Sequence, residues 1–261
     1  MNTPALTIAN AFKTYPGASE PTLHDVSLDL NPGEAFVILG HTGSGKSTLL
    51  RAVAGLEELD SGSVHVAPGT RHAVVFQQAA LFPWLTVREN IALGAQYKKN
   101  AGRVDAPTVN RLIERLGLQG LEDRKVNEIS GGQAQRVSIG RALAIQPSLL
   151  LLDEPFSALD PATRSELQGW LRSLIEELDL TVLMVSHDIS EALTVGDRIG
   201  FFRAQQGFTQ FWSPAHEQVT HEEILEYYRN DGDSDRATFS GSLRDESAKD
   251  LSDKPAHSPT F

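Results

Sequence analysis

The chain lacks cysteine altogether: none occurs among its 261 residues, so disulfide bonds and thiolate-bound metal sites are excluded. It also lacks a continuous apolar run of about 18 residues, so we expect no membrane-spanning helix. Its first residues show no basic stretch followed by an apolar one, and we therefore expect no secretory signal peptide. Together these absences are consistent with a cytosolic protein.

Basic residues are also few. Lys and Arg number 23 against 34 Asp and Glu, which gives a net charge of −11. This balance argues against broad nucleic-acid binding, which needs a positive field. The hydrophobic content of 40% is ordinary for a globular protein, and the length allows one large α/β domain with a substantial core.

The most informative segment that is present is a glycine-rich stretch over residues 40–48. It fits the pattern G-x-x-x-x-G-K-[ST], which binds the phosphates of nucleoside triphosphates. Glycines let backbone N–H groups point at one phosphate, the lysine brings a positive charge to the β and γ phosphates, and the serine hydroxyl can ligate Mg²⁺. The predicted nucleotide-binding residues here are Gly40, His41, Thr42, Gly43, Ser44, Gly45, Lys46, Ser47 and Thr48.

The surroundings of this segment favour a P-loop over a chance glycine turn. Residues 35–39 form a short apolar run that ends at Gly40, as a buried strand does. Residues 48–54 then have the pattern of a helix, which Gly55 stops. Strand, loop and helix therefore follow in the order that phosphate binding requires.

Two carboxylates follow a second apolar run, at residues 148–154. Asp153 is predicted to hold Mg²⁺, and Glu154 to activate the attacking water as a general base. A third apolar run, residues 181–187, ends in His187, which we expect to contact the γ-phosphate and help orient water. Asp188 and Glu191 have capping-box spacing for the next helix.

A second glycine-rich element lies at residues 129–136. Ser130 is a good N-cap, and Gln133 stands three residues later, so we predict a capped helix that ends near Pro147. Gly131 and Gly132 leave backbone N–H groups in its first turn open to an anion. The chain therefore has a second candidate helix end for phosphate.

These motifs together resemble the nucleotide-binding subunit of ATP-binding cassette transporters, over about residues 5–203. In that resemblance Tyr15 matches the aromatic residue that stacks on adenine, and Gln77 matches the Q-loop glutamine, a catalytic residue and metal ligand. Lys46, Glu154 and His187 take catalytic roles, and Ser47 and Asp153 bind metal with Gln77. Ser130, Gly131, Gly132 and Gln133 match the signature motif, and Asp160 lies in the D-loop.

The resemblance implies an α/β fold: a P-loop NTPase core with a mostly parallel sheet, an N-terminal antiparallel β subdomain and an inserted helical subdomain at about residues 78–147. The nucleotide-binding domain would occupy residues 1–229. It implies ATP and Mg²⁺ as cofactors, and a second copy of the chain that completes each ATP site head to tail. The further partners it implies are integral membrane permease subunits and, indirectly, a solute-binding protein, with no nucleic acid, at the cytoplasmic face of the inner membrane.

Residues 77–87, with Pro83, Trp84, Leu85 and Thr86, look most like the importers of nitrate, sulfonate and taurine. Thr86 and Glu89 make a capping box for a helix over residues 87–93. Trp84 either lines the groove for a coupling helix of the membrane subunit or packs inside the helical subdomain; the sequence leaves both open.

Other functions fit the sequence less well. A soluble cassette ATPase acting on DNA or ribosomes is the main alternative, but such proteins separate the P-loop and signature by long insertions or carry two cassettes. A GTPase would need an Asn-Lys-x-Asp motif, which is absent, and a non-catalytic module would lack Glu154 or His187. Residues 230–261 are rich in Asp, Ser and Lys, and we predict a disordered tail that follows a short capped helix from Thr220.

Overall fold

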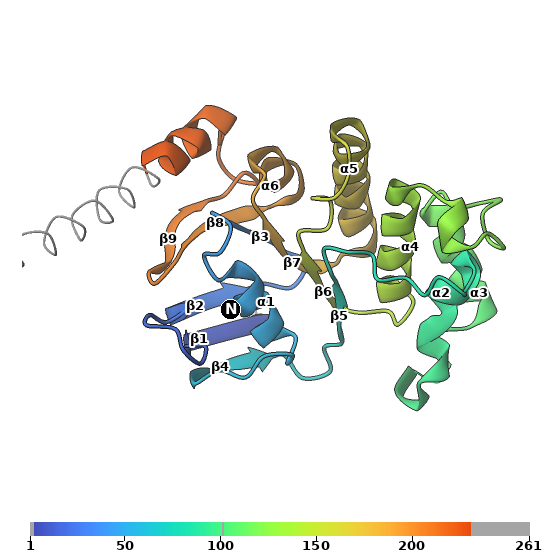
Figure 1. Cartoon of the computed structure of the whole chain (residues 1–261), viewed down its shortest axis with the longest axis horizontal. Helices are drawn as coiled ribbons and strands as arrows, with labels where there is room; N and C mark the ends of the chain where they lie inside the picture. The colour runs from blue at the N-terminus through green and yellow to red at the C-terminus, as the bar shows by residue number, and fades with distance from the viewer. Residues whose placement is uncertain (1–2, 101, 231–261) are drawn as a thin grey trace, which may run out of the picture. The chain divides into compact units, whose positions relative to one another are not determined.

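The computed structural model describes residues 3–100 and 102–230. It divides into two compact units, Met1–Val219 and Thr220–Phe261. Among the described residues, the first unit holds all the strands and nearly all the helices (Figure 1). In the second, residues 221–230 are helical, and the Thr220 hydroxyl accepts a hydrogen bond from the Glu223 N–H (3.2 Å), as its predicted capping role requires. The predicted disordered tail lies outside the described residues, apart from residue 230.

The larger sheet has six strands in the order β5-β6-β7-β3-β8-β9. All neighbours are parallel except β8 and β9, which pair antiparallel. The strands are β3 (Ala35–Leu39), β5 (His72–Val75), β6 (Leu149–Asp153), β7 (Thr181–Ser186), β8 (Arg198–Arg203) and β9 (Gly207–Trp212). Every residue of β3, β6 and β7 is buried, because helices cover both faces of a parallel sheet and leave no polar side.

The smaller sheet is antiparallel, in the order β2-β1-β4. Its strands are β1 (Leu6–Lys13), β2 (Leu23–Leu30) and β4 (Ser61–Val66). In β2 buried and exposed residues largely alternate, as in a sheet with one face against the core. The mostly parallel sheet and the N-terminal antiparallel sheet confirm the predicted fold class.

Helix α1 (Lys46–Val53) joins the two sheets into one core. Its Leu49, Leu50 and Val53 belong to the same buried cluster as Leu6 of β1 and Leu183 of β7. Burying each leucine side chain contributes about 2 kcal/mol. In Figure 1, α1 and the smaller sheet lie on one face of the larger sheet, and α5 (Pro161–Leu178) and α6 (Ile189–Val195) lie on the other.

The segment between β5 and β6 is helical. It contains α2 (Val87–Ala92), α3 (Ala106–Arg115), α4 (Gly131–Leu143) and the 3₁₀ turns Leu93–Gln96, Lys98–Asn100 and Val126–Glu128. The predicted capping box at Thr86 and Glu89 is present in both directions. No helix among residues 3–100 and 102–230 is long and apolar enough to cross a membrane.

Candidate functional site

Four neighbouring strands bring the predicted site residues to one edge of the larger sheet. Gln77 follows β5, Asp153 ends β6 and Glu154 follows it, His187 follows β7, and the P-loop follows β3. Ligands of open α/β sheets bind at these carboxyl ends. A cavity of about 310 Å³, which we call the carboxyl-end cavity, is lined by Thr22, Thr42, Gly43, Gly45, Lys46, Ser47, Thr48, Arg51, Gln77, Asp153 and Glu154.

The P-loop needs glycine at Gly45, directly before α1. This residue has φ 102°, and a Cβ there would lie 2.6 Å from the carbonyl oxygen of Thr22. Only glycine tolerates both the left-handed backbone and this close approach. The turn lets α1 begin at Lys46, two residues before the predicted start, so the helix N-terminus opens directly into the cavity.

Lys46 is held by its own loop. Its Nζ donates to the carbonyl oxygens of Gly40 (2.8 Å) and His41 (2.7 Å), and the residue is buried. Burial lowers the pKa of Lys46, while the nearby carboxylates of Glu154 and Asp153 oppose that shift. A phosphate chain would add a hydrogen-bonded anionic partner to this buried ammonium, whose hydrogen bonds in this structure go to carbonyl oxygens.

Ser47 and Asp153 offer adjacent oxygen atoms. The Ser47 hydroxyl donates to Asp153 Oδ1 at 2.7 Å, across the gap between α1 and β6. A hydroxyl and one carboxylate suit a Mg²⁺ ion that also takes phosphate oxygens and water. No cluster of three His, Cys, Asp or Glu residues able to hold a metal by itself occurs in the described part of the chain. The donor set therefore fits a nucleotide-bound ion rather than a protein-only metal cage.

Glu154 and His187 face each other across β6 and β7. Glu154 Oε2 lies 3.1 Å from His187 Nδ1. Glu154 has φ 46°, which few non-glycine residues adopt, yet its N–H still donates to the Val185 carbonyl of β7 (3.0 Å). Strained backbone of this kind clusters at functional sites.

Gln77 is tied to the segment that follows Glu154. Its Nε2 donates to Ser157 Oγ (3.0 Å), which in turn donates to the Glu154 carbonyl (3.1 Å). Ser157 therefore links the Gln77 side chain to the backbone of Glu154. The sequence offered no signal for this role of Ser157, since 80 positions separate it from Gln77.

Tyr15 lies beside the cavity rather than in its lining. Its hydroxyl is 3.4 Å from Thr48 Oγ1 on α1 and donates to Glu57 Oε2 (3.2 Å). Lys13 pairs with the same glutamate (2.8 Å), and its Nζ lies 5.5 Å from the centre of the Tyr15 ring. Hydrogen bonding to Lys13 lowers the pKa of Glu57, so the carboxylate that anchors Tyr15 stays ionised.

Two lining residues, Thr22 and Arg51, were missed from the sequence. Arg51 Nη2 is 4.0 Å from Asp153 Oδ2. Arg51 stands four residues after Ser47 on α1, so helical spacing could have placed it on the same face. Nothing local marks Thr22, which reaches the cavity from the start of β2.

The signature residues do not line the carboxyl-end cavity. Ser130 caps α4 in a reciprocal box with Gln133, as predicted: Gln133 N–H donates to Ser130 Oγ (3.2 Å), and Ser130 N–H donates to Gln133 Oε1 (2.9 Å). The N–H groups of Gly131 and Gly132 fall in the first turn, where a helix has no acceptor of its own. Asp160 is likewise outside the cavity and caps α5 through Thr163 (3.1 Å).

Gly132 also has a packing role that the sequence did not reveal. A Cβ on it would lie 2.6 Å from Thr163 Cγ2 on α5. Glycine is therefore needed for α4 and α5 to approach closely, and Gly132 is buried between them.

The turn that carries His187 differs from the prediction. Asp188 caps α6 by accepting from the Glu191 N–H (3.0 Å), but the reciprocal half of the predicted box is wrong. The Asp188 N–H donates to Ser186 Oγ (2.9 Å), and the buried Glu191 carboxylate instead accepts from that same hydroxyl. Three-residue spacing predicts that a box can form, but tertiary burial decides where the glutamate points.

Trp84 is 66% exposed, so the alternative that it packs inside the helical segment is wrong. Its ring centre lies 5.1 Å from that of Phe82, which is 36% exposed. Both follow the loop of Gln77, where they present an apolar surface to solvent.

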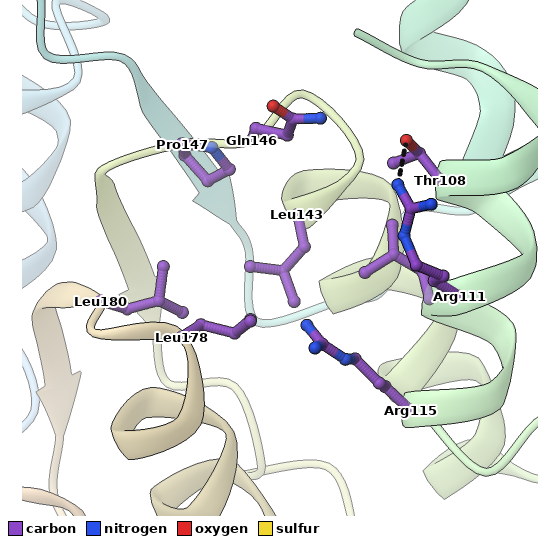
Figure 2. Close-up of a pocket in the computed structure, with 9 residues that line it drawn as sticks. Thr108, Arg111, Arg115, Leu143, Gln146, Pro147, Leu178 and Leu180 are labelled. Carbon is purple, nitrogen blue, oxygen red and sulfur yellow. Dashed lines mark hydrogen bonds between the residues drawn. The ribbon is translucent and has the colours of Figure 1, made fainter.

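A second cavity, of about 260 Å³, opens at the amino ends of β6 and β7, and we call it the amino-end cavity (Figure 2). In Figure 2, Arg111 and Arg115 project from α3 toward it, opposite a wall of leucine and proline side chains. Arg111 donates to Thr108 Oγ1 (3.0 Å), and Arg115 pairs with Glu177 (3.0 Å). Its lining residues are Thr108, Arg111, Leu112, Arg115, Leu143, Gln146, Pro147, Leu178 and Leu180.

Comparison with known proteins places the chain in a family. The ABC transporter family matches residues 23–157. The sulfate/thiosulfate import ATP-binding protein CysA of Nocardia farcinica is 45% identical over 203 residues, which cover 74% of this chain and 61% of that protein. The bicarbonate transport ATP-binding protein CmpD of Synechocystis sp. is 45% identical over 204 residues, which cover 75% of this chain and 72% of that protein.

A solved structure agrees with these relatives. The ATP-binding cassette MJ0796, in a dimeric post-hydrolysis state bound to ADP and Pi, superposes with a TM-score of 0.69 at 30% identity, covering 80% of this chain and 98% of that one. The chain spans about half to three fifths of the length of the first curated relatives it matches. The family match, the relatives and the fold lead to one conclusion: the chain belongs to the ABC transporter family and carries the ATPase domain of that family.

Proposed function

We propose that the chain is the ATP-hydrolysing subunit of an importer, working as a head-to-tail dimer beneath membrane permease subunits. The observation that carries this proposal is the convergence of a P-loop, a Ser47–Asp153 pair and a Glu154–His187 pair at one sheet edge. We further propose that residues 1–229 act as the nucleotide-binding domain, with residues 78–147 as its helical subdomain.

On this proposal the P-loop residues bind the triphosphate. N–H groups of Gly40 to Thr48 surround the β-phosphate, and Lys46 leaves its loop carbonyls to contact the β and γ phosphates. The adenine ring stacks on Tyr15, which its Glu57 and Thr48 contacts hold beside α1. Ser47, Asp153 and Gln77 would hold Mg²⁺, which when bound neutralises charge that develops on the phosphates.

Hydrolysis then falls to Glu154 and His187. Glu154 accepts a proton from the attacking water, and His187 orients that water and contacts the γ-phosphate. With Glu154 ionised, Nδ1 of His187 donates to it, which leaves Nε2 for a second partner. Gln77, linked to the Glu154 backbone through Ser157, couples the base to the loop that precedes the exposed aromatic residues.

The signature residues complete the site of a second copy. Ser130, Gly131, Gly132 and Gln133 form a capped helix end that is absent from the lining of the cavity in their own chain. Across a head-to-tail dimer, this end and Asp160 would meet the ATP held by the opposite P-loop. The dimeric state of the similar cassette MJ0796 supports this arrangement.

Mixing two inactive variants tests the head-to-tail site. Lys46→Ala disables the P-loop, and Ser130→Asp places a carboxylate against phosphate while keeping an N-cap. Each alone loses ATPase activity, but mixing them restores it, because about half of the dimers then contain one intact site. Ser130→Asn, which caps without charge, is the control. If the mixture stays as inactive as either variant, both elements serve the same site within one chain, and the dimer proposal fails.

The relatives support a proposal for the class of solute that is transported. The two relatives described above import sulfate or thiosulfate and transport bicarbonate, which are small anions. The segment from Gln77 to Val87 suggests nitrate, sulfonate or taurine instead. Recognition of the solute belongs to other subunits, so we propose a small oxyanion or sulfonate as cargo, delivered by a solute-binding protein.

Phe82 and Trp84 would receive the permease at the cytoplasmic face of the membrane. They are exposed aromatic residues directly after the Gln77 loop, where apolar area is otherwise costly to leave in water. Trp84→Ala should abolish stimulation of ATPase activity by the co-purified permease and leave basal activity unchanged. Phe211→Ala is the matched control, since Phe211 is an exposed aromatic on β9, at the opposite edge of the larger sheet.

Purification from native membranes separates this function from the soluble alternative. An importer subunit co-purifies with a membrane protein, whereas a cassette ATPase acting on nucleic acid or ribosomes remains with those particles. Recovery of the chain with ribosomes or DNA and with no membrane partner would overturn the importer role.

A further inference from the structure

Glu191 is a buried carboxylate directly behind the turn that carries His187. It is 4% exposed, lies in the first turn of α6, and takes no part in lining the carboxyl-end cavity. Burying a carboxylate is costly unless hydrogen bonds and charges compensate it. A residue kept at this cost calls for a function that an apolar side chain would not supply.

The contacts of Glu191 clamp the turn on both sides of His187. Its carboxylate accepts from the hydroxyl of Ser186, the residue before His187. That hydroxyl also accepts from the N–H of Asp188, the residue after His187 (2.9 Å). The Glu191 N–H closes the loop by donating to Asp188 Oδ1 (3.0 Å).

The clamp is anchored to the rest of the core. Arg164 of α5 pairs with Asp188 Oδ2 at 3.4 Å, and β7 holds Ser186 as its last residue. His187 itself is exposed, and its one described contact is with Glu154. The position of its imidazole therefore depends on the backbone of the turn, which Glu191 fixes through Ser186.

Glu191 keeps one oxygen without a partner. Its Oε1 is buried and makes no hydrogen bond within the described residues. Burial raises the pKa of Glu191 to about 7; Asp188 and Glu154 add to the rise, whereas the Ser186 hydrogen bond and Arg164 oppose it. When protonated, the carboxyl can donate to Ser186 Oγ, whose own proton then turns to the Asp188 carbonyl (3.4 Å). The clamp on Asp188 survives in both protonation states.

We propose that Glu191 is a positioning residue for His187, that it acts through Ser186 and the backbone of Asp188, and that a hydrogen-bonding group rather than a negative charge is what the position requires. This inference rests on the proposed role of His187 in ATP hydrolysis. It adds a residue that never touches the nucleotide but sets the geometry of one that does.

Steady-state kinetics of three variants test the proposal. Glu191→Leu should lower kcat by on the order of tenfold to a hundredfold, because a small misplacement of a catalytic group is costly, with KM for ATP within about twofold. Glu191→Gln should keep kcat within about threefold, since its amide can donate to Ser186 Oγ. Ser186→Ala keeps the Glu191 carboxyl but removes the hydroxyl that links it to Asp188. Its kcat should therefore fall as much as that of Glu191→Leu.

Controls separate positioning from folding. Thr194→Ala removes a hydrogen bond from the same helix to the Ser190 carbonyl (2.7 Å) and should leave kcat unchanged. The ¹H–¹⁵N ring resonances of His187 should shift in Glu191→Leu and Ser186→Ala but not in Glu191→Gln. Full activity in Glu191→Leu, or equal losses in the Leu and Gln variants, would overturn the proposal.

His187→Ala distinguishes failure of the proposed role of His187 from failure of the proposed role of Glu191. If that variant hydrolyses ATP at the normal rate, the proposed role of His187 fails. If it is inactive while Glu191→Leu and Ser186→Ala are active, only the role of Glu191 fails. If Glu191 acts through His187, adding Glu191→Leu to His187→Ala should cause no further loss.

Discussion

Two of the cavities at the ends of the larger sheet, the carboxyl-end and amino-end cavities, are similar in size and contrast in chemistry. The carboxyl-end cavity, about 310 Å³, gathers a lysine, an arginine, hydroxyls, an amide and carboxylates from α1, β6 and the loops next to β2, β3 and β5. The amino-end cavity, about 260 Å³, has two arginines from one helix, and these already contact Thr108 and Glu177. Volume does not separate them. Convergence of chemically distinct groups from distant segments marks the functional site, and strand direction decides at which end it forms.

The largest effect that would sharpen this contrast is expected at Glu154. Glu154→Gln should retain ATP binding and slow hydrolysis by on the order of a hundredfold or more, because the amide cannot accept the proton of water. Glu177→Gln makes the same chemical change at the ion-pair partner of Arg115, which lines the amino-end cavity, and should hydrolyse ATP normally. ATP turnover and nucleotide binding should be measured on both variants. Normal turnover in Glu154→Gln would show that Glu154 is not the general base.

The Mg²⁺ dependence of ATPase activity should change with a substitution at the carboxyl-end cavity but not with one on α3, beside the amino-end cavity. Asp153→Asn weakens a Mg²⁺ ligand, so the Mg²⁺ concentration for half-maximal ATPase activity should rise by on the order of tenfold. Asp105→Asn, at the start of α3, keeps its capping hydrogen bond and should leave that concentration unchanged. A Mg²⁺ titration of the ATPase activity of each variant measures this concentration. Equal values for the two variants would argue against Asp153 as a Mg²⁺ ligand.

Stability should depend on pH through Glu191. Its folded pKa, about 7, is raised above the ordinary 4.5, so the protonated state is favoured by folding. The resulting stability is fully present below about pH 4.5 and is lost as the pH rises through 7, on the order of 3 kcal/mol in all. The free energy of unfolding of the wild type should therefore fall relative to Glu191→Gln over this range. Urea unfolding measures both free energies. A difference between the two proteins that does not change with pH would contradict a raised pKa of Glu191 in the folded state.

The smallest effect is expected at the amino-end cavity itself. Arg115→Gln breaks an exposed pair with Glu177, which costs about 0.2–1 kcal/mol of folding free energy. ATP affinity and turnover should not change. A tenfold loss of ATP affinity in this variant would show that the amino-end cavity is coupled to the carboxyl-end cavity and that the two are not functionally separate.

The sequence predicted the elements whose causes are local. The continuous apolar run at residues 35–39 matches β3 residue for residue, and Ser130 with Gln133 caps α4 as expected. An apolar run between turn signals and an oxygen at an N-cap act over a few residues, so no distant contact can easily overrule them.

What the sequence did not reveal depends on distant contacts. Ser157 joins Gln77 to Glu154, Arg51 approaches Asp153, and Gly132 makes room for Thr163. The direction of the Glu191 side chain was predicted wrongly for the same reason. The contacts of Ser157, Gly132 and Glu191 depend on where another segment lies, which spacing along one segment does not encode. For Arg51, helical spacing indicates the face shared with Ser47 but not the approach to Asp153.

The strand order has a consequence for how such a protein can change over evolutionary time. Because β5 and β6 are hydrogen-bonded neighbours, Gln77 and Asp153 stay side by side whatever the length of chain that connects them. The exposed loop around Trp84, within this connecting segment, can therefore gain, lose or replace residues while the edge of the sheet stays in register. On the proposed function, the same ATP-binding edge can serve different membrane partners through changes confined to the loop around Trp84, which lies outside the carboxyl-end cavity.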